Sequence, residues 1–186
     1  GFCLEFFGRP LGQPEIMTEA QASFLLHGLM RDFWKPEHPL YQPAQSPALA
    51  RHAYALLRWL VLDEKKTRAF YELSGDSRLQ AWQELFQAFR NRARTQGLMS
   101  FPDLLAASVE MLKRKDAAEA VDVEALLVDE AQELSDLHWR LLETFTPQSR
   151  LILSGSENLS IRAYRGARPE QFHQLPGAFA SVTHEP

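Results

Sequence analysis

Two adjacent carboxylates, Asp129 and Glu130, are the residues of this sequence whose types and position could do chemistry. This acid pair directly follows the short apolar run Ala125–Val128, which is typical of a strand. A carboxylate after a strand can hold Mg²⁺ through the waters of the ion. A second carboxylate can orient or deprotonate a water that attacks phosphorus. The alternative is that the acid pair only begins a solvated loop.

The neighbouring elements bear on this choice. Ser135 is a typical first residue of a helix, and the apolar spacing after it predicts a helix to about Phe145. A second apolar run, 151–153, ends in Ser154 and Gly155. Two buried strands joined by a helix form a right-handed parallel unit, and both strands then end at the edge where open α/β sheets bind ligands. We therefore expect the acid pair to face the turn of residues 155–160 across a cleft.

Two longer motifs carry a resemblance to a known family. Residues 126–133 read LLVDEAQE, which resembles the Walker B segment of UvrD/Rep-like superfamily 1 DNA helicases. Residues 155–167 read GSENLSIRAYRGA, which is similar to the next motif of that family, usually G-D-x-x-Q-S-I-Y-x-F-R-G-A. Phe101–Leu105 stands where the family has a phenylalanine-acid-leucine signature, and Gly1–Cys3 resembles the residues just after its T-x-H segment. The resemblance is close from Ser100 onward and loose before it.

The resemblance implies ATP and Mg²⁺ as the cofactors. Asp129 would hold Mg²⁺ through water, and Glu130 would activate the hydrolytic water as the catalytic carboxylate. Gln132, Gly155 and Arg165 would lie near the nucleotide, with Gly155 shaping the turn. For Arg165 a surface ion pair is the competing interpretation.

The resemblance also implies single-stranded or duplex DNA as a partner. Tyr164 takes the place of an aromatic residue that stacks on a base, although a core tyrosine fits the sequence equally well. Arg162 would lie beside it at the DNA. Further upstream, Arg90, Arg92 and Arg94 fall in the last turns of a predicted helix. They either contact phosphates or are cations that the helix dipole favours at its C-terminus.

Three substitutions depart from the family pattern. Ser156 replaces the usual aspartate, and Arg162 replaces a usual tyrosine. Leu159 replaces the glutamine that contacts the γ-phosphate, and a leucine cannot donate a hydrogen bond. Two hypotheses remain open: an active motor with altered coupling, or a degenerate, non-catalytic module that binds DNA or acts as a scaffold in repair or recombination. A third, an unrelated nucleotide-binding fold that shares only the acid pair, conflicts with the Arg-Gly-Ala run.

The sequence contains no G-x-x-x-x-G-K-[ST] loop, so the backbone cradle and lysine that hold nucleotide phosphates are missing. In the helicases that this chain resembles, that loop lies N-terminal to the matching region. We therefore expect a piece of a longer helicase, whose partners include the phosphate-loop part and a second motor domain. By itself the piece should lack ATPase activity.

Composition narrows the class of protein. A formal net charge of −4 over 186 residues argues against coating nucleic acid through bulk charge. The single cysteine, Cys3, excludes an internal disulfide and a cysteine metal cluster, and a cytoplasmic location is expected. No apolar run approaches the roughly 20 residues of a membrane span.

The predicted fold class is α/β with a mainly helical part, namely a partial RecA-like parallel sheet and an all-helical inserted subdomain. Residues 1–14 would end a helix of the preceding RecA-like part. Residues 15–98 would form an all-helical part that resembles the inserted 1B subdomain. Residues 99–186 would form part of the 1A domain, with a short helix at 169–174 and a third strand at 179–183. The lone histidines His138 and His173 are interpreted as surface or packing residues, not as ligands.

Overall fold

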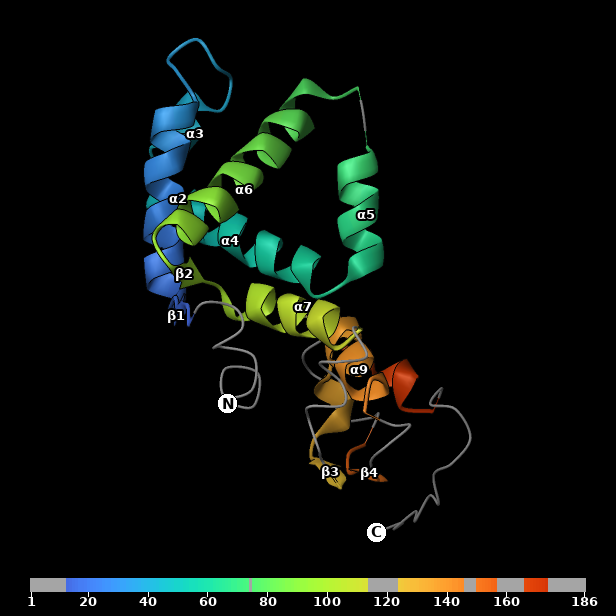
Figure 1. Ribbon diagram of the computed structural model, residues 1–186. Helices are drawn as coiled ribbons and strands as arrows, with labels where there is room; N and C mark the ends of the chain where they lie inside the picture. Colours follow the sequence, from blue (N-terminus) through green and yellow to red (C-terminus); the bar gives the residue numbers. More distant parts are fainter. Residues whose placement is uncertain (1–12, 74, 114–123, 146–149, 157–165, 174–186) are drawn as a thin grey trace. The chain divides into compact units, whose positions relative to one another are not determined.

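The computed structural model describes residues 13–73, 75–113, 124–145, 150–156 and 166–173. The chain divides into two compact units, residues 1–108 and residues 109–186. The described part is mostly helical and contains two small parallel sheets of two strands each. This confirms the predicted class of an α/β protein with a helical part (Figure 1).

Helices dominate the first unit, and most begin at the signals that the sequence offers. Thr18 forms a capping box with Gln21, while Asp63 and Asp76 each accept a backbone N–H from the first turn of their helix. Pro47 occupies the first turn of its helix, where a missing N–H is harmless. The helices are α2 Glu19–Phe33, α3 Tyr41–Ala44, α4 Pro47–Val61, α5 Glu64–Glu72 and α6 Ser77–Thr95, and α7 Phe101–Leu112 begins in the first unit and ends in the second.

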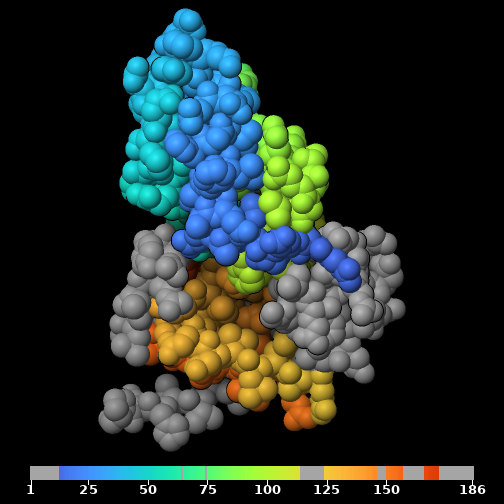
Figure 2. Space-filling model, turned by 90° about the vertical axis from the view of Figure 1, so that its left-hand side faces the viewer, coloured from blue at the N-terminus to red at the C-terminus, as the bar shows by residue number. Residues whose placement is uncertain are grey.

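The core of this unit lies where α2 packs against α4 and α6. Phe86 and Phe89 of α6 are fully buried there, as their helical spacing predicts. The Trp34 and Trp82 rings meet edge to face, with their centroids 4.9 Å apart. In Figure 2, α2 lies in blue between the cyan residues of α3 and α4 and the yellow-green end of α6.

A short parallel sheet also belongs to the first unit, in a region where the sequence predicted only helices. Strand β1, Glu15–Ile16, pairs with β2, Leu98–Met99. Gly97, in the left-handed region at φ 69°, ends α6, and its carbonyl accepts the Glu15 N–H at 2.9 Å. The sequence did not predict this strand pair, because a two-residue strand is too short to show an apolar period.

The second unit has the predicted order of strand, helix and strand. Its elements are β3 Ala125–Val128, the 3₁₀ turn η1 Ala131–Glu133, α9 Asp136–Glu143, β4 Arg150–Leu153 and the 3₁₀ helix η4 Pro169–His173. Strands β3 and β4 are parallel, with Val128 opposite Leu153. The predicted strand at 179–183 and the predicted helix end at 1–14 fall mainly or wholly outside the described residues.

Only one face of the β3–β4 pair is covered by α9. Leu126, Val128, Leu151 and Leu153 pack against Trp139 and Leu142 of that helix. On the other face, Leu127 is 76% exposed and Ile152 is 55% exposed. The sequence predicted two buried strands, and this was wrong for one of their faces. An unbroken apolar run cannot show which side of a strand is covered.

Candidate functional site

The acid pair and the turn after β4 lie together at one edge of the small sheet. Because β3 and β4 are parallel, their carboxyl ends meet there. The Ser154 N–H donates to the Val128 carbonyl and the Ala131 N–H donates to the Ser154 carbonyl, both at 2.9 Å. These bonds extend the ladder beyond the strands and fix the backbone on both sides of the acid pair.

Asp129 is held by donors from both strand ends. Its Oδ1 accepts the Ser154 hydroxyl at 2.5 Å and the Glu130 N–H at 2.9 Å. These two hydrogen bonds, the Ser154 bond above all, lower the pKa of the Asp129 carboxyl below its ordinary value. The side chain is exposed and therefore ionised at neutral pH. Within the described part of the chain, its Oδ2 accepts no hydrogen bond.

Glu130 has an unusual backbone conformation. Its φ of 54° and ψ of 42° place it in the left-handed region, which costs a residue with a side chain about 1–2 kcal/mol. Such conformations persist where surrounding bonds determine them, and they cluster at functional sites. Here the turn η1 follows at once, with the Glu133 N–H donating to the Glu130 carbonyl at 2.9 Å. The conformation sets the direction in which the Glu130 side chain leaves the loop.

Gln132 connects the acid pair to the turn after β4. Its side chain is buried, and its Nε2 donates to Oε2 of Glu130. Its Oε1 accepts the backbone N–H of Ser156 at 3.1 Å. Gly155 lies against this amide so closely that a Cβ at Gly155 would stand 2.2 Å from Gln132 Oε1. The structure therefore requires glycine at this position for steric reasons.

The donor set fits a magnesium ion of the kind that binds with its substrate. Mg²⁺ prefers hard oxygen ligands, keeps several waters and uses one or two protein carboxylates together with substrate phosphates. An ionised, exposed Asp129 with an open Oδ2 is such a ligand. Across the described ranges, no three His, Cys, Asp or Glu side chains cluster as a closed metal cage. An open site of one or two carboxylates does not need such a cage.

The structure thus brings together Asp129, Glu130, Gln132 and Gly155 from the predicted site. Three further predicted residues, Arg162, Tyr164 and Arg165, lie outside the described residues, and so do residues 157–160 of the predicted turn. Two grooves, of about 310 and 390 Å³, are lined only by residues of the first unit, and none of the predicted residues around the acid pair lines them.

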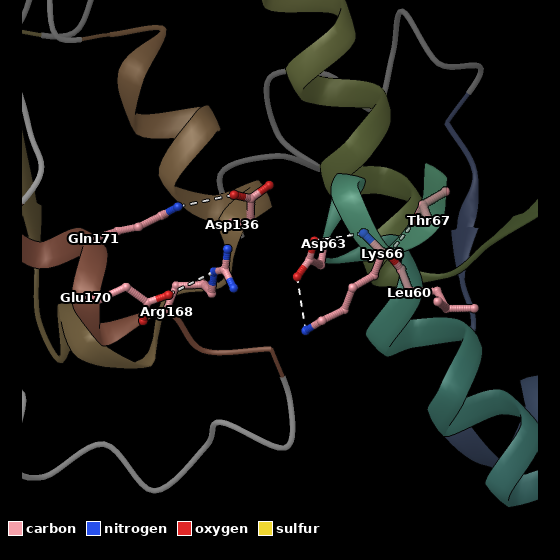
Figure 3. Close-up of polar contacts among 8 residues, drawn as sticks. All are labelled: Leu60, Asp63, Lys66, Thr67, Asp136, Arg168, Glu170 and Gln171. Carbon is pink, nitrogen blue, oxygen red and sulfur yellow. Dashed lines mark hydrogen bonds and ion pairs between the residues drawn. The ribbon is translucent and has the colours of Figure 1, made fainter. Parts of the chain in front are cut away.

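Both flanks of segment 157–165 are attached to the loop that carries the acid pair. On one side, Ser156 is bonded to Gln132. On the other, Ala167 forms an antiparallel bridge with Ser135, and the Arg168 N–H donates to the Leu134 carbonyl at 2.8 Å. Figure 3 shows two further contacts of this region, from Gln171 Nε2 to Asp136 Oδ1 at 3.2 Å and between Arg168 and Glu170 at 3.2 Å.

The three arginines of α6 differ in their surroundings. Arg90 forms an ion pair with Asp103, with Nε and Oδ1 3.4 Å apart, and its side chain is only 23% exposed. Arg92 and Arg94 are exposed. Arg92 also lines a groove of about 390 Å³ between α2 and α6, together with Phe24, Gly28, Gln96 and other residues. Arg92 and Arg94 are therefore the two that remain accessible to a phosphate.

Sequence reasoning missed the contribution of Ser154. The strand register could have indicated this contact. Val128 pairs with Leu153, so the next residues along the two strands, Asp129 and Ser154, lie opposite each other. It also missed the role of His138, whose Nδ1 accepts the Ser135 N–H at 3.3 Å and lies 2.7 Å from Ser135 Oγ. His138 thereby caps α9, in keeping with its interpretation as a packing residue.

None of the described helices is both long and apolar enough to cross a membrane.

Comparison with known proteins supplies the family. No curated protein matches the chain. The family model of the UvrD/REP helicase N-terminal domain matches residues 38–180, which is most of the sequence and includes the acid pair, Gln132 and Gly155. The matched range also contains the Arg-Gly-Ala run and the greater part of the helical unit. The chain therefore belongs to the UvrD/REP helicase family, through the N-terminal domain of these proteins.

Proposed function

We propose that this chain is part of an ATP-dependent DNA helicase or translocase that acts in DNA repair or recombination. The observation that carries the proposal is the edge formed by β3 and β4, where an ionised Asp129 and a Glu130 that accepts a hydrogen bond from Gln132 lie beside the Gly155 turn. Membership of the UvrD/REP family supports the same function. Residues 15–98 would be the inserted 1B subdomain, and residues 99–186 part of the RecA-like 1A domain.

In this proposal Asp129 would hold Mg²⁺ through water, and the ion would supply positive charge that neutralises the phosphates of ATP. Glu130 orients a water molecule and accepts its proton as the water oxygen attacks the γ-phosphorus. The bond between the γ-phosphorus and the oxygen that bridges to the β-phosphate breaks, and ADP and inorganic phosphate leave. Gln132, Gly155 and Arg165 lie near the nucleotide.

The DNA contacts are proposed on both units. Tyr164 stacks on a base and Arg162 lies beside it, while Arg92 and Arg94 of α6 meet backbone phosphates. The exposure of Arg92 and Arg94 supports this assignment. The ion pair with Asp103 gives Arg90 a structural partner instead, so Arg90 is the weakest of the three candidates.

A longer protein that carries this chain together with a phosphate-binding loop provides the test. We expect single-stranded DNA to stimulate its ATP hydrolysis. Glu130→Gln should lower kcat by about 100-fold or more, because it removes the general base, while binding of ATP is retained. Glu124→Gln is the matched control, since Glu124 is an exposed acid at the opposite end of β3. The 186-residue chain alone should not hydrolyse ATP, because it has no phosphate loop.

Two outcomes would contradict the proposal. If Glu130→Gln leaves ATP turnover unchanged, Glu130 is not the catalytic carboxylate. If a correctly folded wild-type protein shows no DNA-stimulated turnover, the active-motor function is wrong. The second candidate, a non-catalytic DNA-binding or scaffold module, would then be favoured, because Ser156 and Leu159 already depart from the family pattern. It predicts DNA binding without ATP turnover.

A further inference from the structure

Gln132 is a buried polar side chain whose two ends reach two different segments. It is 1% exposed, and burying an amide costs free energy unless its groups are hydrogen-bonded. Its Nε2 donates to Glu130 within the same loop, and its Oε1 accepts the N–H of Ser156, which follows β4. The side chain thus spans from one strand end to the other.

Chemistry fixes the orientation of this amide. The Ser156 N–H can only donate, so it must meet the oxygen of the amide and not the nitrogen. The nitrogen then donates to a carboxylate oxygen of Glu130. The hydrogen bond from the Ser156 backbone therefore sets the orientation of the Gln132 amide. In this orientation the amide nitrogen of Gln132 donates to one oxygen of Glu130, Oε2.

Gly155 supplies the space for this arrangement. A Cβ there would lie 2.2 Å from Gln132 Oε1 and 3.1 Å from the Ala131 nitrogen. The φ of 158° is itself a backbone conformation that residues with a side chain rarely adopt, so both the backbone and the lack of space favour glycine at this position. A larger residue would displace the Gln132 amide and, with it, the contact to Glu130.

We propose that Gln132 is a positioning residue that links the backbone of the Gly155–Ser156 turn to the carboxylate of Glu130. A shift of the turn changes the orientation of Glu130 through this amide. The inference rests on the proposed role of Glu130 as general base. The link uses a backbone N–H, which every residue except proline provides, so it is independent of the side chains at Ser156 and Leu159.

Kinetics of the longer protein test the consequence for catalysis. Gln132→Leu removes both hydrogen bonds with little change in size, and kcat should fall by about 10- to 100-fold with an unchanged KM for ATP. Gln87→Leu, at an exposed position of α6, is the matched control and should leave both parameters unchanged. Gly155→Ala should reproduce the fall in kcat, because its methyl group displaces the same amide.

A pH profile separates positioning from a merely structural role. In Gln132→Glu the new carboxyl can replace both amide contacts only when it carries a proton. Its O–H then donates to Glu130 and its carbonyl oxygen accepts from Ser156. The turnover of Gln132→Glu should therefore recover relative to wild type as the pH falls. A constant ratio of the two rates across pH would overturn the proposal, as would an unchanged kcat in Gln132→Leu.

A readout without ATP keeps this inference distinct from the proposed function. In the 186-residue chain, NMR hydrogen exchange should show a protected Ser156 amide that loses its protection in Gln132→Leu. The Glu130 carboxyl ¹³C signal should shift in the same variant and stay in place in Gln87→Leu. Unchanged exchange and an unchanged carboxyl signal would refute the link, whatever the kinetics. If wild type shows no ATP turnover but both NMR changes occur, the proposed function fails while the link stands.

Discussion

At the scale of single residues, the hydroxyl of Ser154 is the main cause of the lowered pKa of the Asp129 carboxyl. The bond from Ser154 Oγ to Asp129 Oδ1 crosses from β4 to β3 and is the largest cause of the lowered pKa of the Asp129 carboxyl. A carboxyl whose pKa is lower in the folded state stabilises the fold above its ordinary pKa of 3.8. This stabilisation is lost as the pH falls through the lowered pKa.

Ser154→Ala should therefore raise the pKa of Asp129 toward its ordinary value, because the strongest donor to Oδ1 is removed. An NMR titration of the Asp129 carboxyl measures this shift. The stabilisation that this carboxyl contributes above its ordinary pKa, and the part of the stability that is lost on acidification, should then become smaller. Ser156→Ala is the matched control, since it removes a hydroxyl two residues away and keeps the backbone N–H. Equal pKa values of Asp129 in wild type and Ser154→Ala would contradict the assignment.

At the scale of elements, the start of α9 depends on a neutral histidine. The Ser135 N–H donates to Nδ1 of His138, which requires that this nitrogen carry no proton. Burial lowers the pKa of His138 below its ordinary value of 6.5. The stability that comes from the neutral side chain is full above that ordinary value and is lost as the pH falls through the lowered pKa.

We expect the melting temperature of the chain to fall as the solution is acidified from neutral pH, and part of this fall should disappear in His138→Gln. Glutamine can accept the Ser135 N–H as in an ordinary capping box, yet it does not titrate. His52→Gln, at an exposed position of α4, is the control and should keep the pH dependence of wild type. If the melting temperatures of His138→Gln and wild type fall in parallel with pH, the protonation of His138 does not affect the stability of the chain.

Element boundaries that carry a local signal were predictable, and those that depend on distant pairing were not. Thr18, Asp76 and Ser135 mark helix starts because their side chains accept backbone N–H groups of the first turn or lie in a capping box. The pairing of Glu15 with Leu98 joins positions far apart in the chain, and no local pattern announces it. The exposure of Leu127 was not predictable either, because the packing of the whole fold decides which face of a strand is covered.

At the scale of the whole molecule, the location of the candidate site could be predicted from the sequence, but its hydrogen bonds could not. The acid pair after an apolar run placed Asp129 and Glu130 at a strand end, and the parallel pairing followed from the intervening helix. The bond from Ser154 depends on the register, and the bridge through Gln132 depends on a buried amide between two loops. Such contacts join residues more than twenty positions apart, so local sequence patterns do not contain them.

The uncovered sheet face has a consequence for the whole chain in solution. Parallel sheets in α/β proteins are normally covered on both faces, and exposed apolar surface promotes association. We expect Leu127→Thr combined with Ile152→Thr to reduce concentration-dependent self-association, measured by sedimentation, with little change in melting temperature. Leu126→Thr, on the face packed against α9, should instead lower the melting temperature. Identical sedimentation of the double variant and wild type would exclude this face as the contact surface.

The short β1–β2 pair brings together the two ends of the helical segment 17–97, so this segment can be replaced as a unit. Because Glu15 lies beside Leu98 and Ile16 beside Met99, the chain leaves the base of the lobe and returns to it at neighbouring points. Insertions whose two ends lie close together can be lengthened, shortened or replaced while the surrounding chain keeps its course. A segment of different length or surface charge can therefore replace residues 18–96 while Glu15 and Ile16 keep their pairing with Leu98 and Met99.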